Sequence, residues 1–257
     1  MQTELCAILE QINSVDVDRI WKGLKSLEAF LESLSPAVRK YHRSGIVSNK
    51  LASFRALQEN FQYNVASGLL KTYSLLASSS QTINDVYFAK ANFLFSGLLL
   101  IHPESRLLFG NEQNMALILS FLDPESGSYK ENLGVSFVSL LIHILIKNVR
   151  NMRLFEKNNG CQILIHHLNV NPAEVSQNQD GGNVAKDQST LHFKVIEFLI
   201  LYLSDESELL ALPNNAGVHG VSVREKADLF RPKFPGIDDL IESLNDLNSL
   251  RSAPYLG

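Results

Sequence analysis

The chain has two cysteines, Cys6 and Cys161, and either could in principle provide the thiolate of a phosphatase. A tyrosine-phosphatase loop needs a cysteine and an arginine six positions later, because the cation stabilises the thiolate and grips the phosphate. Six positions after Cys161 stands His167, and six positions after Cys6 stands Ile12. Neither cysteine therefore meets the requirement, and the sequence favours no phosphatase.

The adjacent pair His166 and His167, close to Cys161, could suggest a zinc site. Neighbouring positions on a helix point about 100° apart, so the two rings do not easily bind one ion. The chain also has no HExxH, CxxC, EF-hand or phosphate-loop pattern. We therefore predict no metal, no cofactor, no small-molecule substrate and no enzymatic activity.

The clusters of charged residues also indicate no catalytic site. Asp238, Asp239 and Glu242 open an amphipathic segment, where carboxylates suit the positive end of a helix dipole. The basic run at 39–43, RKYHR, could touch phosphate or an acidic partner, although it is typical of a solvated turn. A net charge of −4 does not suit a nucleic-acid-binding protein.

The chain shows no sign of export or of a membrane span. Its most apolar run, 133–146, is too short to cross a bilayer and is interrupted by His143. Glu4 precedes every basic residue at the N-terminus, which argues against a secretory signal. Two cysteines that form no pair motif suit a reducing compartment, so we expect the cytoplasm or the nucleus.

An apolar pattern occurs twice at a fixed offset of 46 residues. HPESRLLFGNEQNMALILSFL at 102–122 aligns without a gap on NVRNMRLFEKNNGCQILIHHL at 148–168. The echo extends upstream, and KVIEFLILYL at 194–203 repeats its spacing with an offset of 55 residues from the second copy. Helical periodicity runs through nearly the whole chain, and repeats of 40–47 residues built from helices are typical of armadillo and HEAT arrays.

We therefore predict an all-α fold, an armadillo/HEAT-like right-handed α-solenoid of stacked helical repeats. A single helical-repeat domain should cover 1–257, with repeat boundaries near residues 90, 136 and 191. The polar, glycine-containing segment 171–190 reads as an exposed, mobile loop, and an amphipathic helix is expected near 236–250.

Three segments resemble one known family. GLLLIHPESRLLFGNEQNMALILSFLD, NVRNMRLFEKNNG and KVIEFLILYLSDE, together with IDDLIESLNDL near the C-terminus, are similar to the fungal cell division control protein fourteen family. That family is a component of the septation initiation network and is distinct from the phosphatase of the same name. The resemblance covers most of the chain from about residue 21 onward.

The resemblance implies a non-catalytic subunit that binds a germinal-centre-type serine/threonine protein kinase. It further implies a place in the cytoplasm at the spindle pole body and a role in septum formation and cytokinesis. The alternative left open by the residues is a small hydrolase or phosphatase with an unrecognised site.

A partner surface is predicted from the helix around residue 140. Its polar residues recur at spacings of three and four, and the 55-residue offset carries three of them onto the third copy. In a solenoid these positions would merge into one ridge. The predicted partner-binding residues are His143, Lys147, Arg150, Lys194, Phe198 and Tyr202.

Overall fold

The computed structural model describes residues 1–168 and 182–252, of which 182–190 and 247–252 are described by their backbone alone. Every regular element in these residues is helical, which confirms the all-α prediction. None of these helices is long and apolar enough to cross a bilayer. The α-helices are α1 (Gln2–Ile12), α2 (Val17–Glu32), α3 (Ser35–Ser44), α4 (Asn49–Gln58), α5 (Val65–Ala77), α6 (Asp85–Ile101), α7 (Glu112–Ser120), α8 (Gly134–Leu145), α9 (Val149–Lys157), α10 (Gly160–Leu168), α12 (Gly182–Tyr202), α13 (Ser207–Leu210), α14 (Val223–Asp228) and α15 (Ile237–Ser252). Short 3₁₀ turns are η1 (Phe61–Tyr63), η2 (Pro103–Gly110), η3 (Glu131–Leu133) and η4 (Pro213–Asn215).

Asparagine or aspartate begins many of these helices. The Asp16 carboxylate accepts hydrogen bonds from the backbone N–H groups of Asp18 and Arg19 at the start of α2. Asn84 and Asn148 cap α6 and α9 in the same manner. Such side chains satisfy N–H groups that have no partner within the helix, so the sequence itself sets where these helices start.

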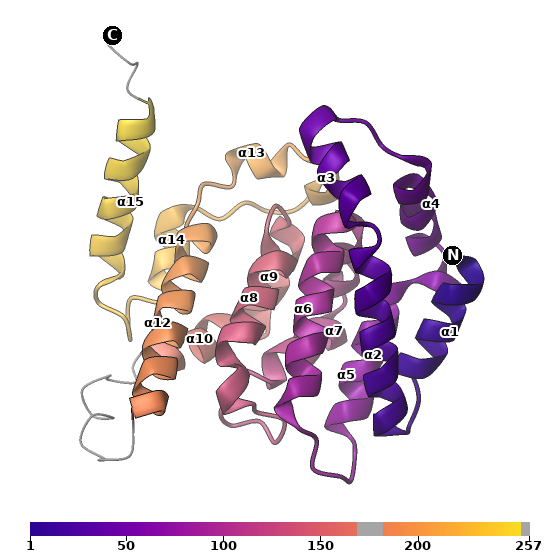
Figure 1. The fold of residues 1–257 in the computed structure, drawn as a ribbon. Coiled ribbons are helices and arrows are strands. Elements are labelled where there is room, and N and C mark those ends of the chain that lie inside the picture. Colours follow the sequence, from indigo (N-terminus) through magenta and orange to yellow (C-terminus); the bar gives the residue numbers. More distant parts are fainter. Residues whose placement is uncertain (169–181, 253–257) are drawn as a thin grey trace.

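Four long helices, α2, α6, α8 and α12, lie side by side in one row (Figure 1). Each contacts the next one in that order, and all four end on the same side of the molecule. Behind the row lies a second layer that contains α5, α7, α9 and α10 (Figure 1). The hydrophobic core fills the space between the two layers.

The 46-residue echo is visible in the burial of the side chains. Phe109 and Phe155 are both fully buried, and Leu108 and Leu154 are both partly buried. The equivalence continues along α6 and α8, where buried positions fall on buried positions. The buried pairs are Ala91 with Phe137, Leu94 with Leu140, Phe95 with Leu141, Leu98 with Ile144, and Leu99 with Leu145. The two copies therefore occupy equivalent depths in the fold.

The predicted 55-residue offset to the third copy is wrong. It pairs Leu145, which is 1% exposed, with Ile200, which is 45% exposed, and the half-buried His143 with the fully buried Phe198. An offset of 54 instead aligns buried with buried: Leu141 with Val195, Ile144 with Phe198, and Leu145 with Leu199. One residue turns a helix by about 100°, enough to exchange core and surface.

The loop prediction at 171–190 is wrong for residues 182–190, which are helical. Residues 169–181 lie outside the described residues, and α12 already begins at Gly182. Segment 182–190 contains alanine, lysine and glutamine, which favour helix, so its polar composition did not indicate a loop. The C-terminal helix placed near 236–250 from sequence runs over Ile237–Ser252 and stands apart from the row (Figure 1).

Basic side chains cap the C-terminal ends of the row. Arg106 donates to the carbonyls of His143 on α8 and Leu99 on α6, at 2.7 and 3.2 Å. Arg55 donates to the carbonyl of Ile101, the last residue of α6, at 2.9 Å. These contacts supply partners for carbonyls that the helices leave free, and they place positive charge at the negative dipole end. They also fix the ends of neighbouring helices level with one another.

Candidate functional site

Exposed apolar side chains lie on the outer side of the row. We call this outer side of the row the front face; Figure 1 draws the row in front of the second layer. Phe93 and Leu100 on α6 are 66% and 56% exposed, and Phe193 and Ile200 on α12 are 72% and 45% exposed. The front face consists of Phe93, Leu100, Ile142, Ile146, Phe193 and Ile200.

Helix geometry places these residues on one surface. Phe93 and Leu100 are seven residues apart, as are Phe193 and Ile200, so each pair projects from one side of its helix. On α6 and α12 this side lies opposite the stripe buried against the second layer. On α8 between them, the partly exposed Ile142 and Ile146 continue the same phase. Exposed apolar side chains on the same side of three neighbouring helices are typical of a protein-interaction site.

Four of the predicted partner-binding residues remain at or near the surface. His143 is half-buried, with its Nδ1 2.7 Å from the carbonyl oxygen of Ser139. Lys194 is partly exposed and forms a 2.6 Å ion pair with Glu197. Lys147 and Arg150 are exposed at the turn between α8 and α9.

The four do not gather into one ridge. Lys194 lies eight residues, or about 12 Å of helix, before the C-terminal end of α12. Lys147 and Arg150 instead lie beyond the C-terminal end of α8, level with the capped ends of the row. Lys147 and Arg150 therefore share the α8–α9 turn, and Lys194 lies apart from them.

The assignment of Phe198 and Tyr202 to a partner surface is corrected. Both side chains are fully buried. Phe198 stacks on Tyr202 with ring centroids 5.7 Å apart, and both contact Phe155. They are core residues, and the offset error of one residue explains why sequence reasoning placed them on the surface.

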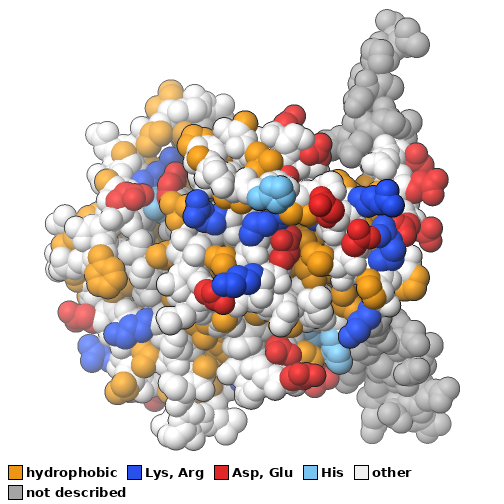
Figure 2. Space-filling view, turned by 180° about the vertical axis from the view of Figure 1, so that it is seen from behind, with side chains coloured by type: hydrophobic (Ala, Val, Ile, Leu, Met, Phe, Trp, Pro, Cys, Tyr) orange, Lys and Arg blue, Asp and Glu red, His pale blue; other side chains and the backbone are white. Residues whose placement is uncertain are grey.

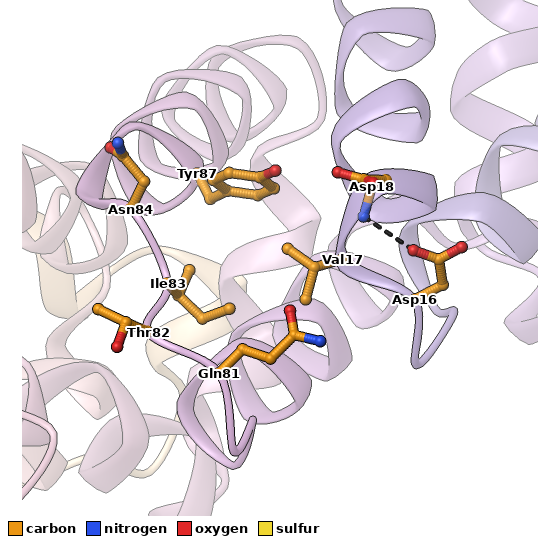
Figure 3. Close-up of a pocket in the computed structure, with 8 residues that line it drawn as sticks. All are labelled: Asp16, Val17, Asp18, Gln81, Thr82, Ile83, Asn84 and Tyr87. Carbon is orange, nitrogen blue, oxygen red and sulfur yellow. Dashed lines mark hydrogen bonds between the residues drawn. The ribbon is translucent and has the colours of Figure 1, made fainter.

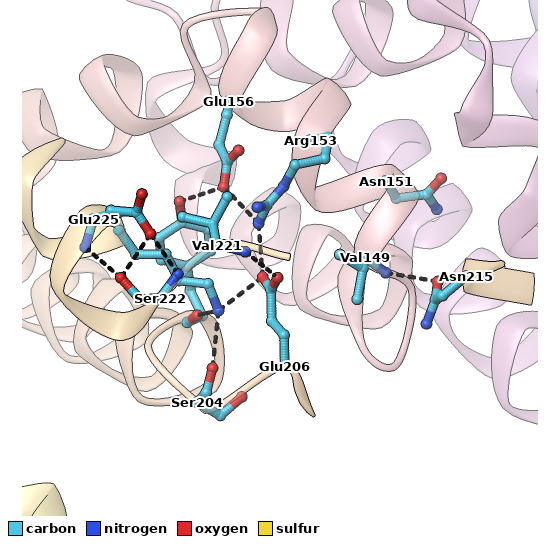
Figure 4. A network of polar contacts seen from close by, with 12 residues as sticks. Val149, Asn151, Arg153, Glu156, Ser204, Glu206, Asn215, Val221, Ser222 and Glu225 are labelled. Carbon is cyan, nitrogen blue, oxygen red and sulfur yellow. Dashed lines mark hydrogen bonds and ion pairs between the residues drawn. The ribbon is translucent and has the colours of Figure 1, made fainter. Parts of the chain in front are cut away.

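A buried polar network ties the end of α12 to α9 and α14 (Figure 4). The carboxylate of Glu206, 2% exposed, lies 2.6 Å from Arg153 Nη2 and 2.9 Å from Lys226 Nζ. The backbone N–H of Val221 donates to the same carboxylate at 3.0 Å. Lys226 also donates to the carbonyls of Tyr202 and Ser204, both at 2.8 Å. Each buried charge therefore has partners, as burial of charge requires.

The same network surrounds Cys161. Its thiol donates to the Tyr202 hydroxyl, which donates to Glu156 at 2.6 Å. Burial raises the pKa of Cys161 to about 12. Burial also raises the pKa of Glu156, against the opposing effects of the Tyr202 hydrogen bond and of Arg153. The thiol is protonated at neutral pH, so it does not provide a nucleophile.

His166 and His167 have separate environments. His167 is buried, with Nε2 2.8 Å from the carbonyl oxygen of Leu122, and its ring stands at 89° to that of the exposed His166. Within residues 1–168 and the described part that follows, no three histidine, cysteine or acidic side chains gather into a possible metal site. His167 belongs to the second echoed copy and Leu122 to the first, so this contact joins the two copies.

A pocket of about 480 Å³ lies between the start of α2 and the loop before α6 (Figure 3). Asp16, Asp18 and Tyr87 line it together with the segment 81–84. The Asp16 carboxylate is engaged in capping α2, and the nearby aspartates contribute to a raised pKa of Tyr87 after the effect of burial. This lining contains no nucleophile paired with a base, the arrangement that covalent catalysis requires.

The side of the molecule opposite the front face is the one drawn in Figure 2. Figure 2 shows lysine, arginine, aspartate and glutamate side chains interspersed among hydrophobic ones on that side. Sequence reasoning missed the front face, although the seven-residue spacing of Phe93 and Leu100 was a usable signal. The apolar residues of these helices were all assigned to the core, and the second, exposed stripe was overlooked.

The fold and the front face define an all-helical protein with a surface suited to binding another protein. The chain belongs to the family described as Cell division control protein 14, SIN component, whose model matches residues 1–220. SIN denotes the septation initiation network, so the family gives the chain a role in septation.

Among curated proteins, the chain is similar to Cell division control protein 14 of Schizosaccharomyces pombe (strain 972 / ATCC 24843). The two are 29% identical over 116 residues, which is 44% of this chain and 40% of the relative. The match thus spans less than half of that relative. No solved structure matches the chain significantly.

Proposed function

We propose that this protein is a non-catalytic binding subunit of a germinal-centre-type serine/threonine protein kinase in the septation initiation network. It supports septum formation and cytokinesis from the cytoplasm and the spindle pole body. The front face carries the proposal, because it exposes two phenylalanines and several aliphatic side chains on a rigid row of helices. Aromatic residues are enriched at the centres of protein interfaces.

The architecture supports a binding role in a second way. A row of parallel helices backed by a second layer, with two copies at equivalent depths, is what an armadillo/HEAT-like α-solenoid would have. Solenoids present broad surfaces for partners, and the capped helix ends keep the row in register. We therefore assign the chain to that class as part of the proposal.

The alternative, a small hydrolase or phosphatase, has no observation in its favour. Cys161 is buried with a raised pKa, and His167 is held against a backbone carbonyl. The titratable groups around Glu206 are paired with one another and connect three helices. They are better explained as a structural network than as a reactive site.

The test is a paired substitution on the front face, Phe93→Glu with Phe193→Glu. Both side chains are largely exposed, so the variant should melt at nearly the wild-type temperature. We expect it to lose co-purification with the co-expressed kinase and to fail to restore septation in fission yeast that lacks its own relative. Phe61→Glu is the matched control, since Phe61 is 90% exposed on η1, outside the row.

Retained kinase binding by the folded double variant would refute the front face as the docking surface. Absence of kinase binding by the wild-type chain would refute the proposed partner itself.

A further inference from the structure

The α3–α4 hairpin is strongly basic in an acidic protein. Residues 33–58 contain five lysines and arginines and no aspartate or glutamate. The whole chain carries a net charge of −4, so the remaining residues together carry −9. Such a separation concentrates positive potential at one edge of the molecule, the upper right in Figure 1.

Two of the five cations hold the hairpin in place. Lys50 donates to the carbonyl oxygen and the hydroxyl of Ser33, both at 3.0 Å. Arg55 donates to the carbonyl of Ile101 and lies 4.8 Å from the ring centroid of Tyr41. These contacts fix α4 to the ends of α2 and α6, so the tip of the hairpin is presented on a rigid base.

The other three cations point to solvent. Arg39, Lys40 and Arg43 are exposed, and none of them has an ion pair among the described residues. Arg39 and Arg43 are one turn apart, and Lys40 lies next to them on the same exposed arc of α3. The helix has no fully buried residue, so these side chains are held at its surface without a structural partner.

Two apolar side chains stand at the tip of the hairpin. Gly45, at φ +69°, ends α3 in the left-handed conformation, and the chain crosses to α4 through residues 46–48. Ile46 and Val47 in this crossing are 56% and 42% exposed. Adjacent exposed aliphatic residues beside three unpaired cations are unusual for a solvated turn, the interpretation that the sequence favoured.

We propose that the α3–α4 tip docks on an anionic lipid surface, with Ile46 and Val47 entering the headgroup region. Arg39, Lys40 and Arg43 would contact the lipid phosphates and carboxylates. A membrane interface combines an apolar layer with negative charge, so it accounts for both features of the tip. An acidic polypeptide would account for the cations alone. The site is separate from the front face and extends the function beyond kinase binding.

The experiment is co-sedimentation of the full chain with vesicles of phosphatidylcholine, with and without phosphatidylserine. We expect binding only to the serine-containing vesicles and release at high salt. Arg39→Glu/Lys40→Glu/Arg43→Glu should weaken binding about tenfold or more, given the affinity that each cation adds near such a surface. Ile46→Glu/Val47→Glu should also weaken binding to the serine-containing vesicles at the same salt concentration.

Matched controls separate the tip from general charge effects. Lys22→Glu/Lys71→Glu/Lys233→Glu makes the same charge change at three exposed lysines elsewhere, and Val15→Glu alters an aliphatic residue that is 89% exposed at the opposite end of α2. These variants should bind like the wild type. Equal losses in the controls, or no binding of the wild type to anionic vesicles, would overturn the proposal.

A soluble polyglutamate provides the other decisive outcome. If it binds the wild type through Arg39, Lys40 and Arg43 while the vesicles do not, the surface serves an acidic protein and the lipid proposal is wrong. Since the vesicle assay does not involve the kinase, its result is independent of the proposed function.

Discussion

The ammonium group of Lys226 lies 2.9 Å from the carboxylate of Glu206, and neither side chain is more than 2% exposed. Lys226 comes from α14 and Glu206 from the segment after α12, while Arg153 on α9 contacts the same carboxylate. The contacts of Glu206 therefore join the end of α12, the last helix of the row, to α9 and α14. Burial lowers the pKa of Lys226, and Glu206 opposes that shift.

Glu206→Gln should lower the free energy of unfolding by about 3–5 kcal/mol, because it leaves the buried Lys226 without its paired carboxylate, whereas Arg153 keeps its 3.0 Å ion pair with Glu156. Urea unfolding followed by circular dichroism measures this. Lys157→Gln is the control: its 2.7 Å ion pair with Glu112 is exposed, so the loss should be about 0–1 kcal/mol. Equal losses in the two variants would show that burial does not control the strength of the Glu206 network.

The buried imidazole of His167 should make stability depend on pH. Burial lowers the pKa of its imidazole below the ordinary histidine value of 6.5, with a smaller contribution from His166. Above pH 6.5 the ring is neutral in both the folded and the unfolded chain. As pH falls below 6.5, the unfolded chain binds the proton first, so this contribution to folding stability is lost progressively down to the lowered pKa.

The difference in unfolding free energy between pH 7 and pH 5 should therefore shrink in His167→Gln relative to the wild type. His166→Gln is the matched control, because its side chain is exposed and should leave that difference almost unchanged. Chemical denaturation at the two pH values measures it. An unaltered difference in His167→Gln would assign the acid sensitivity to other groups.

The sequence predicted the helical class and the 46-residue register, since both depend on local periodicity. Phe109 and Phe155, or Leu98 and Ile144, have the same depth because their apolar patterns place them in equivalent positions. The register of the third copy was missed because an unaligned segment precedes it. A shift of one residue was then enough to exchange Phe198 with a surface position.

The candidate site was less accessible from sequence, for a different physical reason. An exposed Phe93 and a buried Phe95 are the same residue type, and the packing of α6 against α2, α8 and the second layer distinguishes them. The Glu206 network was also invisible, since Arg153 and Lys226 are 73 residues apart in the sequence. Local patterns do not report contacts of that range.

Two helical glycines should respond in opposite ways to alanine. At Gly160, the first residue of α10, an added Cβ would lie 2.2 Å from the ring of Phe155. The buried ring is part of the core, so Gly160→Ala should cost about 1–3 kcal/mol of stability through overpacking. Gly97 inside α6 has no atom within 4 Å of such a Cβ.

Gly97→Ala should therefore stabilise the fold by about 0.5–1 kcal/mol through helix propensity. Thermal melting of the two variants beside the wild type measures both effects. A Gly160→Ala variant as stable as the wild type would show that Phe155 can move, and with it the packing of Phe198 and Tyr202.

The exposed cations at the α8–α9 turn provide the last prediction. Lys147 and Arg150 remain candidates for partner binding, because both face solvent at the end of the row. Lys147 has a left-handed φ of +59°, and its carbonyl accepts a hydrogen bond from Asn214, so its backbone is fixed while its side chain is free. We expect Lys147→Glu/Arg150→Glu to reduce kinase co-purification at least about fivefold, through charge repulsion at the rim of the interface.

Its control is Lys71→Glu/Lys233→Glu, which makes the same charge change at two other exposed lysines and should leave co-purification unchanged. Lys194→Glu tests the remaining predicted cation separately, since its ion pair with Glu197 would be replaced by repulsion within α12. If the α8–α9 variant melts normally and still retains the kinase, these cations do not contact it. Binding would then depend on the apolar front face, where Phe93 and Phe193 are the residues to test.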